Sequence, residues 1–576
     1  MAEPSRRPPA PWADQAPLRW DLGSAGSVDE LRRATADEAA AWVSHRQYPP
    51  LGRLVVVTSR LALAVAAWAA VERGTPGSRT GLSDRLRHAF ARLGPTYIKL
   101  GQILSSGEGL FPDELVASFA LLRDRVPPEP FHLVRRTIEE DLGAPLADRF
   151  VSFDHRPLAS ASIAQVHAAA LRDGTPVVVK VQRRQVASQV RRDLNVLCWL
   201  APALVGRIPV AALANPPALV ELFAETISEE LDFRLEAQNM LDVAAVLART
   251  GQRAIVVPRP HAELVTRRVL VMERLSGFSW SDVEAMRAAG IDTAAVLRSA
   301  LIALLEGALL EGVFHGDLHG GNLFVQRDGR VALLDFGITG RLDERQRLAF
   351  LRLQAGATAN DLEAQVTAMR DLGALPADSD IPTVIAELGL DRPAIDPTAL
   401  TAEELLGELR AVTAALLGIG ARLPKPLMLF VKDLLFLNGS MATMAPEVDL
   451  LGEVVAVVEH FTRNHGERIA RDIGQQLATA PTDLAGYRAA LGLVNEEDSL
   501  TFRELQERRE LIRRRLAARR RGSEPTGTGG GGPPRRARLL GARLLGGKGS
   551  RSSGVVEGAS HLGDEGRRPF GARSLQ

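Results

Sequence analysis

The residues best suited to chemistry lie in the segment Val313–Gly337. It contains His315, Asp317 and Asn322 in the order His-x-Asp-x4-Asn, and an Asp-Phe-Gly triplet begins at Asp335. Carboxylate and amide oxygens are the ligands that Mg²⁺ prefers, so Asn322 and Asp335 are predicted to hold a metal ion. A carboxylate placed beside them can orient or deprotonate an attacking hydroxyl, and we predict this catalytic role for Asp317.

A second chemical feature is Lys180, which stands inside the apolar run Pro176–Val181. A buried ammonium group is costly unless it meets an anion. Glu236, flanked by apolar neighbours on the predicted long amphipathic helix Glu229–Ala237, is the expected partner. The order of these parts matches the lysine, catalytic loop and metal loop of protein-kinase-like phosphotransferases, so Lys180 and Glu236 are assigned to the catalytic set.

The nucleotide-binding elements are expected around a hairpin. Two apolar runs, Ile163–Leu171 and Pro176–Val181, flank an Asp-Gly pair, which is typical of a hairpin turn. The loop before the hairpin has small side chains that let backbone N–H groups approach phosphates. The adenine is expected at the end of a later strand, where kinase-like folds place the hinge. The predicted nucleotide contacts are Lys180, Ala159, Ser160, Ala161, Ser162, Met272 and Glu273.

Further motifs resemble the UbiB/AarF family of atypical kinases, whose members support ubiquinone (coenzyme Q) biosynthesis. Tyr97–Gln102 resembles the family's Lys-x-Gly-Gln motif, Glu230-Leu-Asp resembles its Glu-x-Asp motif, and Ala159–His167 resembles its Ala-rich loop. Arg123–Pro128 also fits, and the likeness spans roughly residues 80–345. The resemblance implies that four residues restrict the site as a regulatory motif: Lys99, Gln102, Glu230 and Asp232.

The resemblance also implies a fold and an activity. The fold is α+β, a bilobal kinase-like structure with an N-terminal helical extension and a helix-rich C-lobe. The expected cofactors are ATP (or ADP) and Mg²⁺. The implied function is an atypical kinase or ATPase that supports quinone or other isoprenoid-lipid metabolism, with a lipid or quinone-precursor ligand. Two alternatives stay open: a non-catalytic nucleotide- and lipid-dependent regulator, and a small-molecule phosphotransferase.

Composition limits the other classes of protein. The 576 residues carry 70 Lys+Arg against 69 Asp+Glu, a net charge of +1, so no nucleic-acid partner is expected. The one cysteine, Cys198, lies in an apolar run and is predicted to be an inert core thiol; it excludes an intrachain disulfide. His315 is predicted to brace the catalytic loop, and a packing role is favoured for His319.

The chain divides into segments of different composition. We expect a disordered N-terminus (1–26), a helical extension (27–94), a kinase-like N-lobe with the Lys-x-Gly-Gln segment (95–273), a helical C-lobe (274–465), an Arg-rich helical segment (466–521) and a disordered Gly/Arg-rich tail (522–576).

Location follows from the apolar segments. The first 20 residues have no apolar core typical of a secretory signal. The most apolar stretch, Leu54–Val71, has Arg60 in its interior and is short for a membrane span. A helix packed on the protein is favoured, and an interfacial helix whose Arg53 and Arg60 reach lipid head groups is the alternative. The expected location is the cytoplasm, with a peripheral contact to the inner face of the bacterial membrane as the open alternative.

Overall fold

The structure is a computed structural model. It describes residues 19–43 (except Ser24), 49–105 (except Pro76), 112–122, 127–204, 216–390, 424–474, 481–490 and 500–508, together with a few single positions. All of these belong to one unit, Met1–Leu516. The predicted N-terminus lies mostly, and the Gly/Arg-rich tail entirely, outside the described residues, as do Arg123–Val126.

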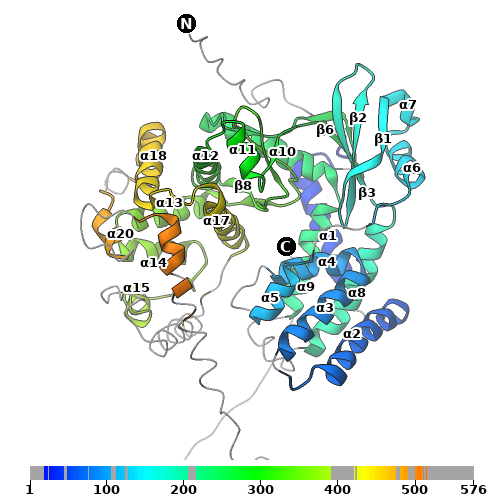
Figure 1. The fold of residues 1–576 in the computed structure, drawn as a ribbon, viewed down its shortest axis with the longest axis horizontal. Coiled ribbons are helices and arrows are strands. Elements are labelled where there is room, and N and C mark those ends of the chain that lie inside the picture. Colours follow the sequence, from blue (N-terminus) through cyan, green and yellow to red (C-terminus); the bar gives the residue numbers. More distant parts are fainter. Residues whose placement is uncertain are drawn as a thin grey trace, which may run out of the picture. The chain divides into compact units, whose positions relative to one another are not determined.

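The N-terminal extension is helical, as expected. Residues 27–94 form α1 (Val28–Val43), α2 (Leu51–Val71) and α3 (Ser78–Leu93). Two more helices, α4 (Pro95–Ser105) and α5 (Asp113–Phe119), follow in the segment predicted as the N-lobe, and all five are drawn in blue in Figure 1. They pack beside α8 (Val186–Leu204) and α9 (Pro216–Glu230). The Lys-x-Gly-Gln segment forms α4, so this motif reaches the rest of the molecule on a helix.

One helix of this extension is exposed. Only Val57 of α2 is buried, while Leu51, Leu63 and Val71 are about two-thirds exposed at 68%, 70% and 67%. The predicted packing on the protein is present along one face, where Val57 lies in a cluster with Leu93 and Tyr97, and the outer face is left exposed. Arg53 and Arg60, which were predicted to reach lipid head groups in the alternative, instead contact the protein. Arg53 pairs with Asp193, and Arg60 donates to the Arg92 carbonyl.

The central sheet has the order β1-β2-β3-β6-β5 and is antiparallel throughout. Its strands are β1 (Phe150–Ser160), β2 (Ala164–Leu171), β3 (Pro176–Gln182), β5 (Pro260–Val265) and β6 (Val269–Glu273). The predicted hairpin is confirmed as β2 and β3. The predicted small-residue loop is only partly a loop, because residues 158–160 form the end of β1, a strand that the sequence reading missed.

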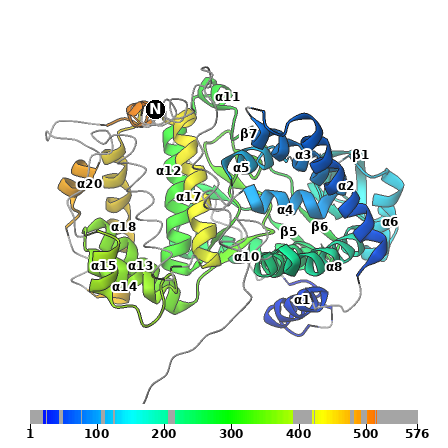
Figure 2. The ribbon, with the colours of Figure 1, turned by 90° about the horizontal axis from the view of Figure 1, so that it is seen from below.

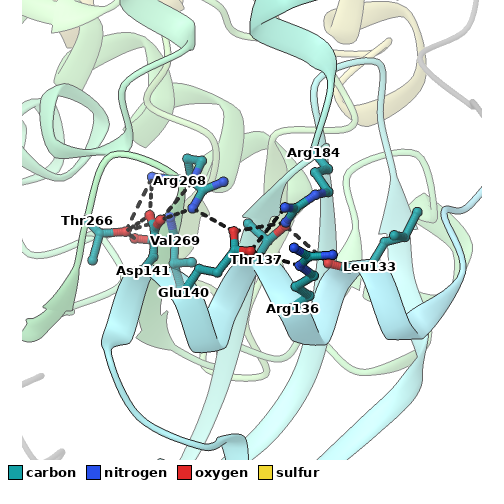
Figure 3. Close-up of polar contacts among 9 residues, drawn as sticks. All are labelled: Leu133, Arg136, Thr137, Glu140, Asp141, Arg184, Thr266, Arg268 and Val269. Carbon is teal, nitrogen blue, oxygen red and sulfur yellow. Dashed lines mark hydrogen bonds and ion pairs between the residues drawn. The ribbon is translucent and has the colours of Figure 1, made fainter.

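A helix covers one face of this sheet. α6 (Phe131–Leu142), followed by the short α7 (Leu146–Arg149), places Val134 and Ile138 against Val177 and Val179 of β3. Figure 3 shows the polar contacts that fix α6 beside the β5–β6 turn. Asp141 accepts a hydrogen bond from Arg268 Nε at 2.7 Å, and Glu140 pairs with Arg184 and Arg136. The helix is thus held by apolar packing at its centre and by ion pairs at its C-terminal end.

The opposite face of the sheet meets α10 (Phe233–Thr250). Ala164, Leu270 and Met272 join the main hydrophobic core together with Phe233 and Met240 of this helix. Because side chains alternate along a strand, residues of β3 that do not face α6 point toward α10. This alternation sends Lys180 to the α10 side.

The C-terminal half is largely helical. Small sheets carry the loops: β4 (Ile255–Val256), β10 (Val331–Leu333), β9 (Leu323–Val325) and β7 (Phe278–Ser279) form one, and β11 (Thr339–Arg341) with β8 (Val313–His315) forms another. The helices are α11 (Val283–Ala288), α12 (Thr293–Glu306) with the π-turn η3 (Gly307–Glu311), α13 (Glu344–Thr358), α14 (Leu362–Asp371), α15 (Ile381–Glu387), α17 (Lys425–Met444), α18 (Leu450–Ile473) and α20 (Leu484–Ala490).

Two of these helices frame the loops. Figure 2 shows α12 and α17 lying side by side, and their packing is extensive. Judged by length and apolar composition alone, three described helices are long enough to cross a membrane: Leu51–Val71, Thr293–Glu311 and Lys425–Met444, which are 11%, 61% and 33% buried. The second is a core helix, and the first is the one left most exposed.

Candidate active site

Lys180 is held by carboxylates from two other elements. Its Nζ lies 2.7 Å from Glu236 Oε1 and 3.1 Å from Asp335 Oδ1. The ammonium also stands 5.4 Å from the centre of the Phe233 ring, a cation–π distance. Burial disfavours the charged ammonium, but Asp335 and then Glu236 outweigh it and raise the pKa of Lys180. The lysine is therefore a fixed cation at physiological pH.

Glu236 owes its position to a helix break. The predicted continuous helix Glu229–Ala237 is wrong: α9 ends at Glu230, and α10 begins at Phe233. Asp232 caps the new helix by accepting from the Arg234 backbone N–H at 3.1 Å, and it pairs with the Arg234 side chain. Capping residues of this kind begin helices because they satisfy free N–H groups. Glu236 then lies in the first turn of α10, facing Lys180.

Asp335 follows β10 with an unusual backbone. Its φ is +56°, a left-handed conformation that costs free energy for a residue with a side chain and that clusters at functional sites. The turn is held because the Gly337 N–H donates to Asp335 Oδ1 at 3.3 Å and Asn239 donates to the Phe336 carbonyl at 2.8 Å. Its side chain is half exposed (51%), which leaves the carboxylate open to a ligand.

The catalytic loop is braced from within. His315 is buried; its Nδ1 accepts from the Asp317 N–H at 3.2 Å, and its Nε2 lies 3.2 Å from the Leu334 carbonyl. Burial lowers the pKa of His315, which keeps it neutral for this bracing role. The Asn322 amide nitrogen donates to the Asp317 carbonyl at 3.0 Å, so its oxygen stays available for a cation. His319, by contrast, is exposed, so the packing role favoured for it is wrong.

Two residues of α17 complete this loop, and the sequence reading missed both. Lys432 Nζ makes a short ion pair with Asp317, and Asp433 accepts the Leu318 N–H at 2.8 Å. Burial opposes the charge on Asp317, but Lys432 and then Lys99 keep its pKa below the usual range. Asp433 is fully buried, and burial raises its pKa well above the ordinary value.

α4 reaches the same place through Lys99. Its ammonium lies 2.7 Å from Glu230 Oε1, at the end of α9. Burial raises the pKa of Glu230 to about 7, while Lys99 opposes the rise. Gly101 allows the close approach of α4, because a Cβ there would lie 2.2 Å from Leu122 Cδ1. Gln102 donates to the Leu122 carbonyl at 3.3 Å, so it fixes the helix rather than facing the cavity.

The predicted phosphate loop divides into two parts. Ala161 and Ser162 line the cavity, whereas Ala159 and Ser160 pair with β2 as the end of β1. Arg183, which the sequence reading did not single out, clamps the turn by donating to the Ala161 carbonyl at 2.9 Å and to Ser160 Oγ at 2.8 Å.

The predicted hinge residues end β6. Met272 pairs with strands on both sides, and the Glu273 N–H donates to the Arg259 carbonyl at 2.8 Å. The Glu273 N–H is thus already paired within the sheet, and the assignment of Met272 and Glu273 to adenine binding stays a prediction. Cys198 is partly buried and burial raises its pKa to about 11, which agrees with an unreactive thiol.

These side chains enclose a small cavity. Its volume is about 40 Å³, which is enough for water but smaller than a nucleotide. Its charged lining has more acids than bases: Glu230, Glu236, Asp317 and Asp335 against Lys99 and Lys180. An excess of carboxylates beside an amide oxygen suits Mg²⁺, so Asp335 and Asn322 fit the metal that a phosphate-bearing ligand would bring.

Comparison with known proteins agrees with this geometry. The family model described as "ABC1 atypical kinase-like domain" matches residues 121–369. An uncharacterized protein of Mycobacterium tuberculosis is 35% identical over 457 residues, 78% of this chain and 91% of that protein. An aarF domain-containing protein kinase of Arabidopsis thaliana, named chloroplastic and uncharacterized, is 31% identical over 407 residues. The match covers 66% of this chain and 75% of that protein.

Two further matches cover less of the chain than the Mycobacterium tuberculosis relative does. The "Probable protein kinase UbiB" of Marinobacter nauticus is 37% identical over 282 residues, which cover about half (51%) of its length. A solved complex of a Mycobacterium tuberculosis protein with erythromycin is 22% identical, with a TM-score of 0.35 over 64% of this chain and 97% of that one. The family model and the aarF domain-containing relative, which is 31% identical over 75% of its length, show that the chain belongs to the UbiB/AarF family of atypical kinases, with an α+β kinase-like fold.

Proposed function

We propose that this protein binds Mg-ATP (or ADP) and acts as an atypical kinase or ATPase. The observation that carries the proposal is the convergence of Lys180, Glu236, Asp317 and Asp335 around one acid-rich cavity. Asn322 adjoins this set through its hydrogen bond to the Asp317 carbonyl. Each group has a defined partner that fixes its charge or orientation. A site that had lost its activity would be expected to lack at least one of them.

The charge of each residue fits a different role in phosphoryl transfer. Lys180 holds phosphate oxygens, as a cation that Glu236 keeps in place. Asp335 and Asn322 would hold Mg²⁺, which neutralises charge that develops on the transferred phosphoryl group. Asp317 remains an anion because of Lys432 and orients the attacking hydroxyl or water.

Access to this site depends on α4. The Lys99–Glu230 pair closes the cavity from the side of the N-terminal extension. A nucleotide that displaces this pair would expose Glu230, whose raised pKa makes protonation available near neutral pH. We propose that Lys99 and Glu230 restrict the site, with Gly101 and Gln102 fixing α4; Asp232 contributes by starting α10.

The pathway and location are further parts of the proposal. Membership of the UbiB/AarF family supports a role in quinone or other isoprenoid-lipid metabolism. The exposed apolar surface of α2 supports a peripheral membrane contact, because monomeric proteins rarely leave such a surface uncovered. A non-catalytic lipid-dependent regulator with the same fold is the competing proposal.

The test is nucleotide binding and ATP turnover by purified protein, with and without anionic liposomes. Turnover that needs Mg²⁺, rises with liposomes and disappears in Asp335→Asn would support the enzyme. Tight binding without turnover under both conditions would favour the regulator. Absence of nucleotide binding would reject both.

The membrane part has its own test in a flotation assay. Val55→Glu with Leu63→Glu places two charges on the exposed face of α2, where the side chains are 61% and 70% exposed. Loss of vesicle binding is expected from this pair. Val151→Glu, at a residue 58% exposed on β1, is the matched control and should still float.

A further inference from the structure

A second group of ligand-type side chains lies outside the candidate active site. Glu306 ends α12, and His460 and His465 lie on α18, the helix that packs against it (Figure 1). The Nε2 atoms of the two histidines lie 2.7 and 3.0 Å from the same carboxylate oxygen, Glu306 Oε1. Two imidazoles therefore converge on one carboxylate from a helix more than 150 residues later in the chain.

The spacing fits a metal ion. One ligand atom from each residue lies within 4.8 Å of the other two. A tetrahedral zinc ion with ligands at about 2.0–2.1 Å holds its ligand atoms about 3.3 Å apart. Relative to Glu306, each histidine needs to withdraw by about 0.3–0.6 Å to reach this spacing. The two imidazole nitrogens, which lie within 4.8 Å of each other, need to close around the ion.

The environment supports a built site rather than a surface cluster. The Glu306 side chain is 2% exposed, and a buried carboxylate is costly without a compensating cation. Its second oxygen, Oε2, accepts from Gln252 Nε2 at 3.2 Å, and the Asn464 amide lies 3.1 Å from His460 Nδ1. Outer contacts of this type orient the ligands of metal sites.

The backbone also changes at this point. The regular helix α12 ends at Glu306, and the π-turn η3 follows directly over Gly307–Glu311. π-Helical turns of this kind are rare in proteins, and those that occur are often found at functional sites. A Cβ on Gly307 would lie 2.6 Å from the Val313 carbonyl, so this position is packed closely. The end of α12, and with it Glu306, is therefore held in a defined place.

We propose that Glu306, His460 and His465 bind a zinc ion, with water in the fourth position, and that the ion ties α18 to α12. The partly exposed His460 (28%) provides the side from which the ion and water enter. The site is separate from the candidate active site, since none of its three ligands lines that cavity. The proposal does not depend on nucleotide binding or turnover.

The test uses full-length protein purified without a histidine tag and treated with a chelator. Zinc added back should bind at about one ion per chain, measured by mass spectrometry of the metal after dialysis. Cobalt in the same site should give the visible absorption of a tetrahedral ion, and zinc should raise the melting temperature. Asp335→Asn should keep this zinc, which separates it from any metal at the nucleotide site.

Variants make the proposal falsifiable. His460→Gln with His465→Gln should lose the zinc and the cobalt absorption, and Gln252→Ala should weaken zinc binding about 10-fold or more. His132→Gln, at an exposed histidine of α6, is the matched control and should bind normally. If the double variant does not fold, His460→Gln alone decides, because this side chain is partly exposed. Wild-type protein that binds no zinc, or a cobalt spectrum that survives in the variants, would overturn the proposal.

Discussion

At the scale of single residues, the candidate site is a set of charges that fix one another. Asp335 and Glu236 keep Lys180 charged, and Lys432 with Lys99 keeps Asp317 charged. In a partly buried site each partner shifts the next by more than it would in water. Substitution of one member should therefore be visible in the titration of another.

The pair of Asp317 and Lys432 gives the first prediction. Lys432→Met removes the cation that lowers the pKa of Asp317, so this pKa rises. If Asp317 must be ionised for turnover, the acidic limb of the pH–rate profile moves to higher pH, by about one unit. Lys425→Met, on the same helix, is the control. An unchanged limb would show that Asp317 does not act as the ionised group.

Glu230 gives the second prediction, in the stability of the protein. Its pKa is about 7 when folded against an ordinary value of 4.5, so the folded state binds more protons and stability is lost as pH rises through this interval. Glu230→Gln removes the loss. The free energy of unfolding of the variant, relative to that of the wild type, should rise between pH 4.5 and 7 by up to about 3 kcal/mol. Above pH 7 the difference should stay constant.

Melting temperatures across this pH range test the sign. The difference between variant and wild type should grow with pH and then level off. A difference that stays constant from about pH 4.5 to 8 would mean that Glu230 titrates normally, and the proposed protonation of the Lys99–Glu230 pair would then be wrong.

At the scale of elements, close approaches of backbone decide where the site loops lie. Gly277, which follows β6, crosses the strand β9 that leads from Asn322. A Cβ at this glycine would lie 2.4 Å from the Val325 carbonyl, a backbone atom that cannot move aside. The segment between the two halves of the fold therefore requires glycine at this crossing.

The third prediction follows from this crossing. Gly277→Ala should destabilise the protein by about 1–3 kcal/mol, as overpacking does in other cores. Gly439→Ala on α17 is the control: nothing lies within 4 Å of its Cβ position, and alanine suits a helix better than glycine. Thermal unfolding compares the two. Equal effects would show that the crossing is looser than the structure indicates.

At the scale of the whole molecule, the candidate site draws on elements that lie far apart in the described chain. Lys99 comes from α4, Lys180 from β3, Glu236 from α10 and Lys432 from α17. A ligand that contacts these parts together binds only the folded state, and binding of this kind raises the stability of the whole.

The fourth prediction is the size and origin of that effect. Mg-ADP at about 100 times its dissociation constant should stabilise the protein by about 2.7 kcal/mol, which a thermal shift assay detects. The part that requires Mg²⁺ should disappear in Asp335→Asn. A Mg²⁺-dependent shift that persists in this variant would place the metal elsewhere than on Asp335.

The sequence by itself determined the local parts of the site. The position of Lys180 inside an apolar run was enough to predict an anionic partner, and the hairpin around Asp173-Gly174 was confirmed. The order His-x-Asp-x4-Asn and Asp-Phe-Gly is a property of short segments, so it indicated the kinase-like family, which the comparisons show. The assigned roles of these residues stay predictions until they are tested.

Only the tertiary structure decided which distant groups meet. Lys432 and Asp317 are 115 residues apart, and no local pattern distinguishes this lysine from a solvated one. The break after Glu230 depends on a cap at Asp232 that competes with helix continuation, and the exposure of α2 depends on what packs against it. The periodicity of a sequence indicates which face of a helix or strand is apolar. It does not indicate which two charged side chains will meet, because their meeting depends on how elements far apart in the chain pack together.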